Sequence, residues 1–279
     1  MRRASVAVRD MPAALAIAGV DPSGGAGLFA DLRAFAAAGA WGCGVPTINT
    51  IQSTAGMRGG RALATRDVIA QLREIASTEN VRSIKIGALG SATNVRAILL
   101  WLREVPKLPV VLDPVMLPSR GRRGARLLDR AGMRILQRLA AQVFLVTPNV
   151  PEAEALTGTT IRSIADAERA ARALVEAGSR AALVKGGHLP VSAGRGKTVD
   201  VLAVGSRVVH FSAPRLAISV HGTGCTLASL IAGRMAERRI GVEASDQSII
   251  DAVRWAKNRL QRALRQPARI GAGHLVLPL

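Results

Sequence analysis

Short apolar runs alternate with helical patterns along nearly the whole chain, and this alternation limits the possible folds most strongly. The first apolar run, at residues 13–19, is followed by Leu28, Leu32 and Phe35 at helical spacing, and Gly39 is placed to end that helix. Runs typical of buried strands occupy residues 13–19, 81–86, 109–113, 143–147 and 181–185. The pattern predicts a three-layer α/β fold, in which a mostly parallel sheet has helices on both faces.

The last third of the chain departs from this alternation. Residues 199–204 and 207–211 are both β-rich and flank Gly205-Ser206, which predicts a short antiparallel hairpin near residues 199–211. Two helices are then predicted, over residues 226–238 and 246–265. Since no repeat or low-complexity linker divides the chain, we expect a single domain over residues 13–279, preceded by a disordered basic tail at residues 1–12.

Composition indicates a reducing compartment and no membrane span. The 279 residues include two cysteines, Cys43 and Cys225, which argues against a disulfide framework. No run of about 18 apolar residues occurs, so no transmembrane helix is expected. Asp10 and Pro12 interrupt anything similar to a signal-peptide core. We therefore expect a cytoplasmic protein.

The formal net charge of +19 makes a nucleic-acid partner a necessary alternative. However, aromatic residues make up only 3% of the chain and tyrosine is absent, so base-stacking platforms are scarce. The arginines are spread widely, apart from one cluster at Arg120, Arg122, Arg123 and Arg126. We favour a composition bias over specific nucleic-acid binding, with non-specific attraction to polyanions in either case.

A glycine-rich turn at residues 219–226 joins an extended stretch to an apolar helix. Gly222 and Gly224 allow the backbone to turn tightly, which leaves N–H groups unpaired at a helix start, where anions bind. Cys225 follows at the first turn, where a thiol pKa tends to be lowered. A reactive side chain beside an anion site suits phosphoryl or acyl transfer. A buried cysteine in an ordinary helix start is the alternative reading.

Polar residues also follow several predicted strands. Asp113 ends one strand, Asn149 and Glu152 follow another, and Lys185 ends a third. The carboxyl ends of parallel strands meet at one edge, so these side chains are expected near the glycine turn. Two acids beside a phosphate site indicate Mg²⁺, with Lys185 neutralising phosphate charge. Each acid could instead cap a helix or form a salt bridge.

These motifs together resemble the hydroxymethylpyrimidine/phosphomethylpyrimidine kinases of thiamine biosynthesis, which belong to the ribokinase-like superfamily. The resemblance extends from about residue 14 to about residue 265, in the order found in the family. Its pieces are Asp21-Pro22-Ser23-Gly24-Gly25-Ala26-Gly27 with Ala30-Asp31-Leu32, Ala40-Trp41-Gly42-Cys43, Gln52-Ser53-Thr54, Lys85-Ile86-Gly87, Asp113-Pro114-Val115-Met116, residues 147–153, Lys185-Gly186-Gly187-His188 and residues 221–226.

The resemblance implies an ATP-dependent kinase that uses Mg²⁺. Its substrate would be 4-amino-5-hydroxymethyl-2-methylpyrimidine, the monophosphate of this alcohol, or both. Cys225 would act as the catalytic base, at a position that is an aspartate in sugar kinases. The remaining implied roles are an anion hole formed by Gly222, Thr223 and Gly224, Mg²⁺ ligands at Asp113 and Glu152, and ATP-phosphate contacts at Asn149 and Lys185.

The resemblance also implies a pyrimidine subsite surrounded by Gly19, Asp31, Gln52 and Val115. A glutamine amide suits this ligand, because it can donate and accept toward the ring nitrogens and the amino group of an aminopyrimidine. Ionised Asp31 can only accept.

Three departures from the family pattern concern substrate preference more than fold. Ala88 stands where the family often has methionine, the loop after Met116 is longer and more basic, and the C-terminal ending differs. A pyridoxal or pyridoxine kinase is one alternative, since that branch shares the fold. A sensor domain that binds the pyrimidine phosphate without turnover is another. The resemblance further implies a homodimer.

Overall fold

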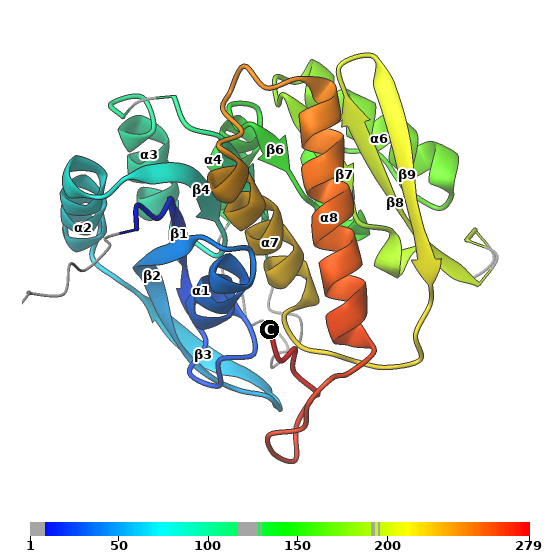
Figure 1. Cartoon of the computed structure of the whole chain (residues 1–279), viewed down its shortest axis with the longest axis horizontal. Coiled ribbons are helices and arrows are strands. Elements are labelled where there is room, and N and C mark those ends of the chain that lie inside the picture. The colour runs from blue at the N-terminus through cyan, green and yellow to red at the C-terminus, as the bar shows by residue number, and fades with distance from the viewer. Residues whose placement is uncertain (1–8, 106, 117–127, 129, 191–192, 195) are drawn as a thin grey trace, which may run out of the picture.

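The computed structural model describes residues 9–105, 107–116, 128, 130–190, 193–194 and 196–279. The arginine cluster at 120–126 and most of the expected basic tail lie outside this range. Within it, nine strands form one sheet in the order β3-β2-β1-β4-β5-β6-β7-β8-β9 (Figure 1). The strands are β1 (Ala13–Val20), β2 (Trp41–Ser53), β3 (Gly56–Ala62), β4 (Val81–Ile86), β5 (Val110–Leu112), β6 (Leu145–Val146), β7 (Ala181–Val184), β8 (Lys197–Val204) and β9 (Arg207–Pro214).

The sheet is mostly parallel, as the sequence predicts. The six strands from β2 to β7 in sheet order run parallel, and β3, β8 and β9 are antiparallel to their neighbours. The predicted hairpin near residues 199–211 is confirmed as β8–β9, somewhat longer at both ends. A second hairpin, β2–β3, was not predicted, because its second strand contains Gly56, Gly59 and Gly60, which have weak strand preference.

Helices cover both faces of the sheet, which confirms the predicted three layers. One face packs against α1 (Gly27–Ala37), α7 (Thr223–Arg238) and α8 (Asp246–Leu264). The other face packs against α2 (Thr65–Thr78), α3 (Ala92–Trp101), α4 (Arg130–Ala140), α5 (Val150–Thr157) and α6 (Ile164–Glu176). Strand alternation separates the two cores: Leu15 and Ile17 of β1 face the second group, whereas Ala14 and Ala16 face the first.

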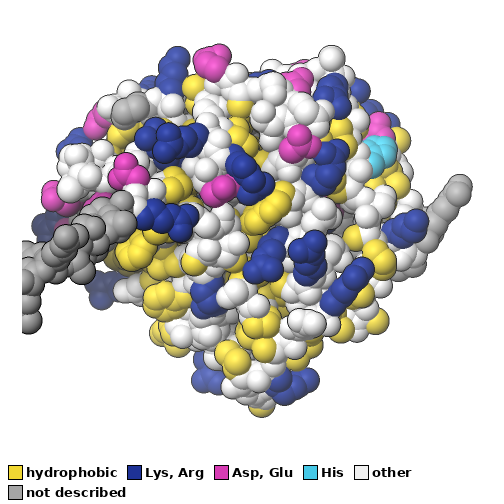
Figure 2. All heavy atoms as spheres, viewed as in Figure 1, with side chains coloured by type: hydrophobic (Ala, Val, Ile, Leu, Met, Phe, Trp, Pro, Cys, Tyr) yellow, Lys and Arg dark blue, Asp and Glu magenta, His cyan; other side chains and the backbone are white. Residues whose placement is uncertain are grey.

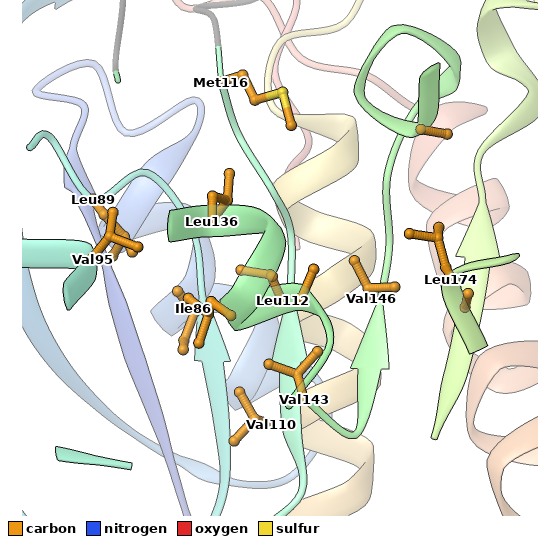
Figure 3. Packing of buried hydrophobic residues seen from close by; sticks show 14 of the residues in the cluster. Ile86, Leu89, Val95, Val110, Leu112, Met116, Leu136, Val143, Val146 and Leu174 are labelled. Carbon is orange, nitrogen blue, oxygen red and sulfur yellow. The ribbon is translucent and has the colours of Figure 1, made fainter. Parts of the chain in front are cut away.

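The α4-side core packs directly beneath the carboxyl edge of the sheet. Ile86, Leu112 and Val146 lie on neighbouring strands, and Leu136 of α4 packs on them (Figure 3). Each of these buried side chains stabilises the fold by roughly 1.5–3 kcal/mol. Asp113 follows Leu112, and its N–H donates to the carbonyl of Ile86 at 2.9 Å. Packing therefore fixes the strand ends that carry polar residues. None of the helices in the described range is long and apolar enough to span a bilayer.

Candidate active site

The glycine turn before α7 is formed by interlocking with a second glycine-rich loop. Gly222 is the N-cap of α7 and has a left-handed backbone with φ of 77°. A Cβ at this position would lie 2.0 Å from the carbonyl oxygen of Gly25, so no larger residue fits there. The loop after β1 thus packs against residues about 200 positions later in the chain. This contact joins two motifs that the sequence shows only separately.

The start of α7 is open to an anion. The helix begins at Thr223, three residues before the predicted start, which places Cys225 in its first turn. The N-cap residue, Gly222, makes no side-chain capping hydrogen bond, so the first N–H groups of α7 have no capping partner from that residue. The extended stretch predicted before the turn is not a strand that leads into it, since β9 already ends at Pro214. Residues 215–222 instead form a loop that bridges to Leu275 through Val220.

Asp113, Lys185 and Glu152 form a buried cluster beside the α7 turn. The ammonium of Lys185 lies 2.7 Å from Asp113 Oδ1 and 4.0 Å from Glu152 Oε2. A Cβ at Gly224 would lie 3.2 Å from Lys185 Nζ, so the ammonium adjoins the anion-binding turn. The sequence prediction that these strand ends converge agrees with this placement.

Both acids also make the ordinary structural contacts that the sequence left open. Asp113 is salt-bridged to Lys185, and Glu152 takes part in the capping box of α5. In that box, Asn149 N–H donates to Glu152 Oε2 at 2.8 Å, and Glu152 N–H donates to Asn149 Oδ1 at 2.9 Å. The box fixes Glu152 at the mouth of the cluster and leaves its second carboxylate oxygen for a ligand.

Charge within this cluster shifts the pKa values in opposite directions. Burial alone would raise the pKa of Asp113, but attraction to Lys185 and Lys85 lowers it. Burial alone would lower the pKa of Lys185, but attraction to Asp113 and Glu152 raises it. For Glu152, burial outweighs Lys185, and repulsion from Asp113 helps to raise the pKa to about 7. One acid of the pair is therefore firmly ionised and the other titrates near neutrality.

The expectation of a lowered thiol pKa at Cys225 is wrong for this structure. Burial raises the pKa of Cys225 to about 12, against attraction to the Lys85 ammonium. The carboxylates of Asp113 and Asp31 add to this rise. The stabilisation that a helix start gives to a thiolate is too small to offset burial among two carboxylates.

One large cavity of about 970 Å³ unites most of the predicted site residues. Its wall includes Asp113, Val115, Asn149, Glu152, Lys185 and residues 222–225. The cavity continues past Arg215 toward β8 and α8, where Thr198 and Leu264 contribute to its wall. This space is large enough for two small ligands side by side.

Four residues are expected around a pyrimidine, and all four lie in the described part of the chain. Val115 lines this cavity, whereas Gly19, Asp31 and Gln52 do not. A Cβ on Gly19 would lie 2.8 Å from Ile48 and 3.5 Å from Ala88. Val115 and Ala88 both pack against Ile48 and its neighbour Met57. Gly19, Ala88 and Val115 thus lie around one small apolar cluster at the β1 end.

Asp31 is placed behind the cavity wall, which does not match a contact with a pyrimidine. Its side chain is fully buried, and Lys85 Nζ donates to Oδ2 at 2.7 Å. Ser229 of α7 donates to Oδ1 at 2.7 Å. With both oxygens bonded inside the protein, Asp31 ties β4 and α7 to α1. Sequence reasoning missed this pair, although a lysine inside the apolar run 81–86 was its signal.

Two further polar networks beside the cavity were also missed. His221 Nε2 lies 2.8 Å from Asp21 Oδ2, and Lys257 Nζ donates to Asp200 Oδ2 at 2.6 Å. The second pair had a sequence signal, because Asp200 interrupts an apolar strand. The first pair had none, since Asp21 and His221 come from motifs at opposite ends of the chain.

The cluster suits a divalent cation that shares its ligands with phosphate. Among the described residues, no group of three or more His, Cys, Asp or Glu side chains could hold a metal alone. Mg²⁺ typically takes one or two carboxylates and completes its shell with phosphate oxygens and water. Asp113 and Glu152 supply that number, and a nearby cation would keep Glu152 ionised. The residues therefore fit Mg²⁺ bound together with a phosphate ligand.

The sequence and the fold of this chain are similar to those of known proteins. The family model described as phosphomethylpyrimidine kinase matches residues 21–278. The hydroxymethylpyrimidine/phosphomethylpyrimidine kinase of Escherichia coli is 36% identical, over 95% of this chain and 96% of that protein. The crystal structure of phosphomethylpyrimidine kinase from Clostridium difficile is 30% identical with a TM-score of 0.75, covering 91% of this chain and 99% of that one.

Some curated relatives are longer than this chain. The thiamine biosynthesis bifunctional protein ThiED of Geobacter sulfurreducens is 39% identical over 93% of this chain, which spans only 50% of that relative.

Proposed function

Because the chain belongs to the phosphomethylpyrimidine kinase family, we propose that it transfers a phosphoryl group from ATP to an aminopyrimidine of thiamine biosynthesis. The acceptor is hydroxymethylpyrimidine, its monophosphate, or both. The observation that most supports this proposal is the meeting of Lys185, Asp113 and the open first turn of α7 on one cavity. Such a place can hold a transferring phosphoryl group between a cation and backbone N–H groups.

The two ligands occupy different parts of the cavity in this proposal. ATP lies toward β8 and α8, with its phosphates at Lys185 and Asn149. The pyrimidine lies toward Val115, Gly19 and Gln52, so that its hydroxymethyl or phosphate group reaches Cys225. Both reacting groups then meet at the α7 turn, where the N–H groups of Thr223 and Gly224 are available to phosphoryl oxygens.

The residues of the cluster and Cys225 divide the work of phosphoryl transfer. Lys185 neutralises charge on the transferring group, and Asp113 holds that ammonium in place at 2.7 Å. Asp113 and Glu152 hold Mg²⁺, which when bound supplies further neutralisation of phosphate charge. Cys225 Sγ takes the proton from an alcohol acceptor, and a phosphate acceptor needs no such base because it is already ionised.

Steady-state kinetics on the purified full chain test this function. ADP release is measured with ATP and each of hydroxymethylpyrimidine, its monophosphate and pyridoxal, with and without Mg²⁺. We expect Mg²⁺-dependent turnover of at least one pyrimidine, with a higher kcat/KM than for pyridoxal. Preference for pyridoxal would replace the proposal with a vitamin B6 kinase. Tight pyrimidine binding without turnover would indicate a sensor.

We also propose that the chain acts as a homodimer in the cytoplasm, as the family resemblance implies. Light scattering after size exclusion checks the first part: a mass near twice 29.2 kDa is expected. A mass of one chain across the concentration range would contradict it.

A further inference from the structure

His221 joins four separate segments of the chain. Its Nε2 lies 2.8 Å from Asp21 Oδ2, in the loop after β1, and 3.0 Å from Gln52 Nε2 at the end of β2. Its backbone N–H donates to the carbonyl of Leu275 in the C-terminal segment at 2.8 Å. The next residue is Gly222, the N-cap of α7.

The proton on His221 Nε2 follows from its neighbours. Asp21 is 3% exposed and accepts hydrogen bonds from Ser23 N–H, Ser23 Oγ–H and Ala26 N–H. Burial alone would raise the pKa of Asp21, but His221 and the hydrogen bonds from Ser23 lower it, so the carboxylate is held in its ionised form. An ionised carboxylate at 2.8 Å requires an N–H facing it. His221 therefore carries its proton on Nε2.

This proton decides the orientation of the Gln52 amide. A nitrogen that bears a proton cannot also accept one from the Gln52 –NH2 group, which lies 3.0 Å away. Rotation by half a turn exchanges the oxygen and nitrogen of an amide, and the surrounding hydrogen bonds determine which of the two orientations is adopted. With Oε1 toward His221, the single Nε2–H is shared between Asp21 Oδ2 and Gln52 Oε1, and –NH2 takes the outer position. Among the described residues, none donates a hydrogen bond to the outer amide atom.

We propose that His221 is a positioning residue, which directs the –NH2 group of Gln52 to the substrate and thereby selects a ring nitrogen as its partner. This inference rests on the proposed function, because it takes Gln52 as part of the pyrimidine subsite. An outward –NH2 needs an acceptor, which a ring nitrogen offers and the exocyclic amino group does not.

His221 also fixes the distance between the proposed pyrimidine subsite and the anion-binding turn of α7. The imidazole packs on Gly25, where a Cβ would lie 2.5 Å from His221 Cδ2, and Gly25 in turn contacts Gly222. Asp21 and Gln52 hold the ring from one side, and Gly222 begins the anion-binding turn on the other. A pyrimidine aligned by Gln52 is thus set in register with the phosphoryl site.

Substitutions at His221 test the positioning role in the full chain. His221→Leu should raise the KM for the pyrimidine by about 10-fold to 100-fold, the loss expected for a buried hydrogen-bond pair, and leave the KM for ATP within about twofold. His221→Gln offers an amide N–H to Asp21 and should recover part of this loss. His274→Leu is the matched control, because His274 lines the same small cavity as His221 without these contacts. Equal changes in both KM values, or no recovery in His221→Gln, would overturn the inference.

Gln52→Glu tests the direction of the amide. A carboxylate still accepts from His221 but has no –NH2 to donate, so pyrimidine affinity should fall by at least about tenfold. Unchanged affinity, measured by calorimetry without ATP, would overturn the orientation. A pyrimidine analogue with the relevant ring nitrogen replaced by C–H should bind wild type and Gln52→Glu equally.

The tautomer is measured without any turnover. Nitrogen-15 correlation spectra of the ligand-free protein at about pH 8 should show a proton on His221 Nε2. A proton on Nδ1 instead would overturn the inference. If wild type phosphorylates no pyrimidine, the proposed function fails, whereas the spectra and the calorimetry still decide the role of His221.

Discussion

At Cys225, a helix start and burial act in opposite directions on the thiol. Its place in the first turn of α7 favours a thiolate, yet burial and the nearby carboxylates raise its pKa to about 12. The thiol is therefore protonated at neutral pH, and only a small fraction is available as a base. That fraction increases about tenfold with each unit that the pH rises toward the pKa.

The pH dependence of alcohol phosphorylation follows from this shift. With Cys225 as base, we expect kcat for hydroxymethylpyrimidine to rise about tenfold per unit between pH 6 and 8, where proton removal limits the rate. Cys225→Asp should flatten this rise, because a carboxylate is ionised throughout that range. Cys225→Ala should lower the alcohol rate by roughly 10²–10⁴-fold and the monophosphate rate much less. Equal losses on the two substrates would remove the base role.

Glu152 is the second residue whose charge is set by burial. Its pKa rises from an ordinary 4.5 to about 7, so between these values the folded protein binds one more proton than the unfolded chain. The free energy of unfolding should then fall with rising pH across that window, by at most about 1.4 kcal/mol per unit, and level off above pH 7. Mg²⁺ with a phosphate ligand should restore stability above pH 7, because it favours the ionised carboxylate.

Urea unfolding between pH 4.5 and 8 measures this slope. Glu152→Gln should remove most of the Glu152 contribution while keeping the reach of its side chain to the Asn149 N–H. The exposed Glu176 provides the control, since Glu176→Gln should leave the slope as in wild type. If Glu152→Gln keeps the wild-type slope, the slope arises from other groups.

At the scale of elements, the sequence predicts what depends on local pattern. The parallel strands, the β8–β9 hairpin and the convergence of Asp113 and Lys185 follow from alternation and from strand ends. The β2–β3 hairpin could not be predicted, because its glycine- and arginine-rich strand has little local preference and is held by pairing to β2. Nor could the fit of Gly25 against Gly222, since nothing local marks a contact across the whole chain.

The Asp200–Lys257 pair belongs to this long-range class, and it joins three elements. Asp200 of β8 accepts from Lys257 of α8 at 2.6 Å and from the N–H of Gly186 at 2.9 Å. Gly186 directly follows Lys185, and a Cβ there would lie 1.8 Å from the Val199 carbonyl oxygen. The pair therefore presses the Lys185 loop onto β8 and places α8 beside it.

Removing one partner should cost more than removing both. Lys257→Met leaves a buried carboxylate unpaired, with an expected loss of about 3–5 kcal/mol in unfolding free energy. The double variant Asp200→Asn/Lys257→Met should regain part of this, because the amide introduced at position 200 still accepts from Gly186 and carries no charge. The KM for ATP should rise more than the KM for the pyrimidine, since the loop after Lys185 adjoins the proposed nucleotide side. Strict additivity of the two losses would show that the pair does not act as a unit.

At the scale of the whole molecule, the net charge of +19 goes with an uneven distribution of charged side chains on the face that carries α7 and α8. Figure 2 shows many Lys and Arg side chains on the face that carries α7 and α8, with acidic side chains mainly in its upper half. Asp246 and Asp251 lie in the first half of α8, whereas Arg262 in its last turn and Arg265 at its C-cap are exposed. Gln261 and Leu264 on the same turn line the cavity. The arginine-bearing C-terminal end of α8 thus flanks the part of the cavity proposed for ATP.

Such a field should speed the arrival of ATP and weaken with salt. We expect kcat/KM for ATP to fall as NaCl rises from about 0.02 M to 0.3 M, because the screening length shortens over that range. The value for hydroxymethylpyrimidine, a neutral alcohol, should change far less. Arg262→Glu/Arg265→Glu should lower kcat/KM for ATP at low salt and flatten its salt dependence.

A double variant with the same change of charge at another location distinguishes this steering from a general effect of net charge. Arg96→Glu/Arg172→Glu changes the net charge equally, but these exposed residues lie on α3 and α6, on the opposite face of the sheet. If approach is guided by the end of α8, this pair should behave nearly as wild type at every salt concentration. Equal losses in the two double variants would mean that ATP responds to total charge. No loss in either would mean that the arginines of α8 only reflect the composition of the chain.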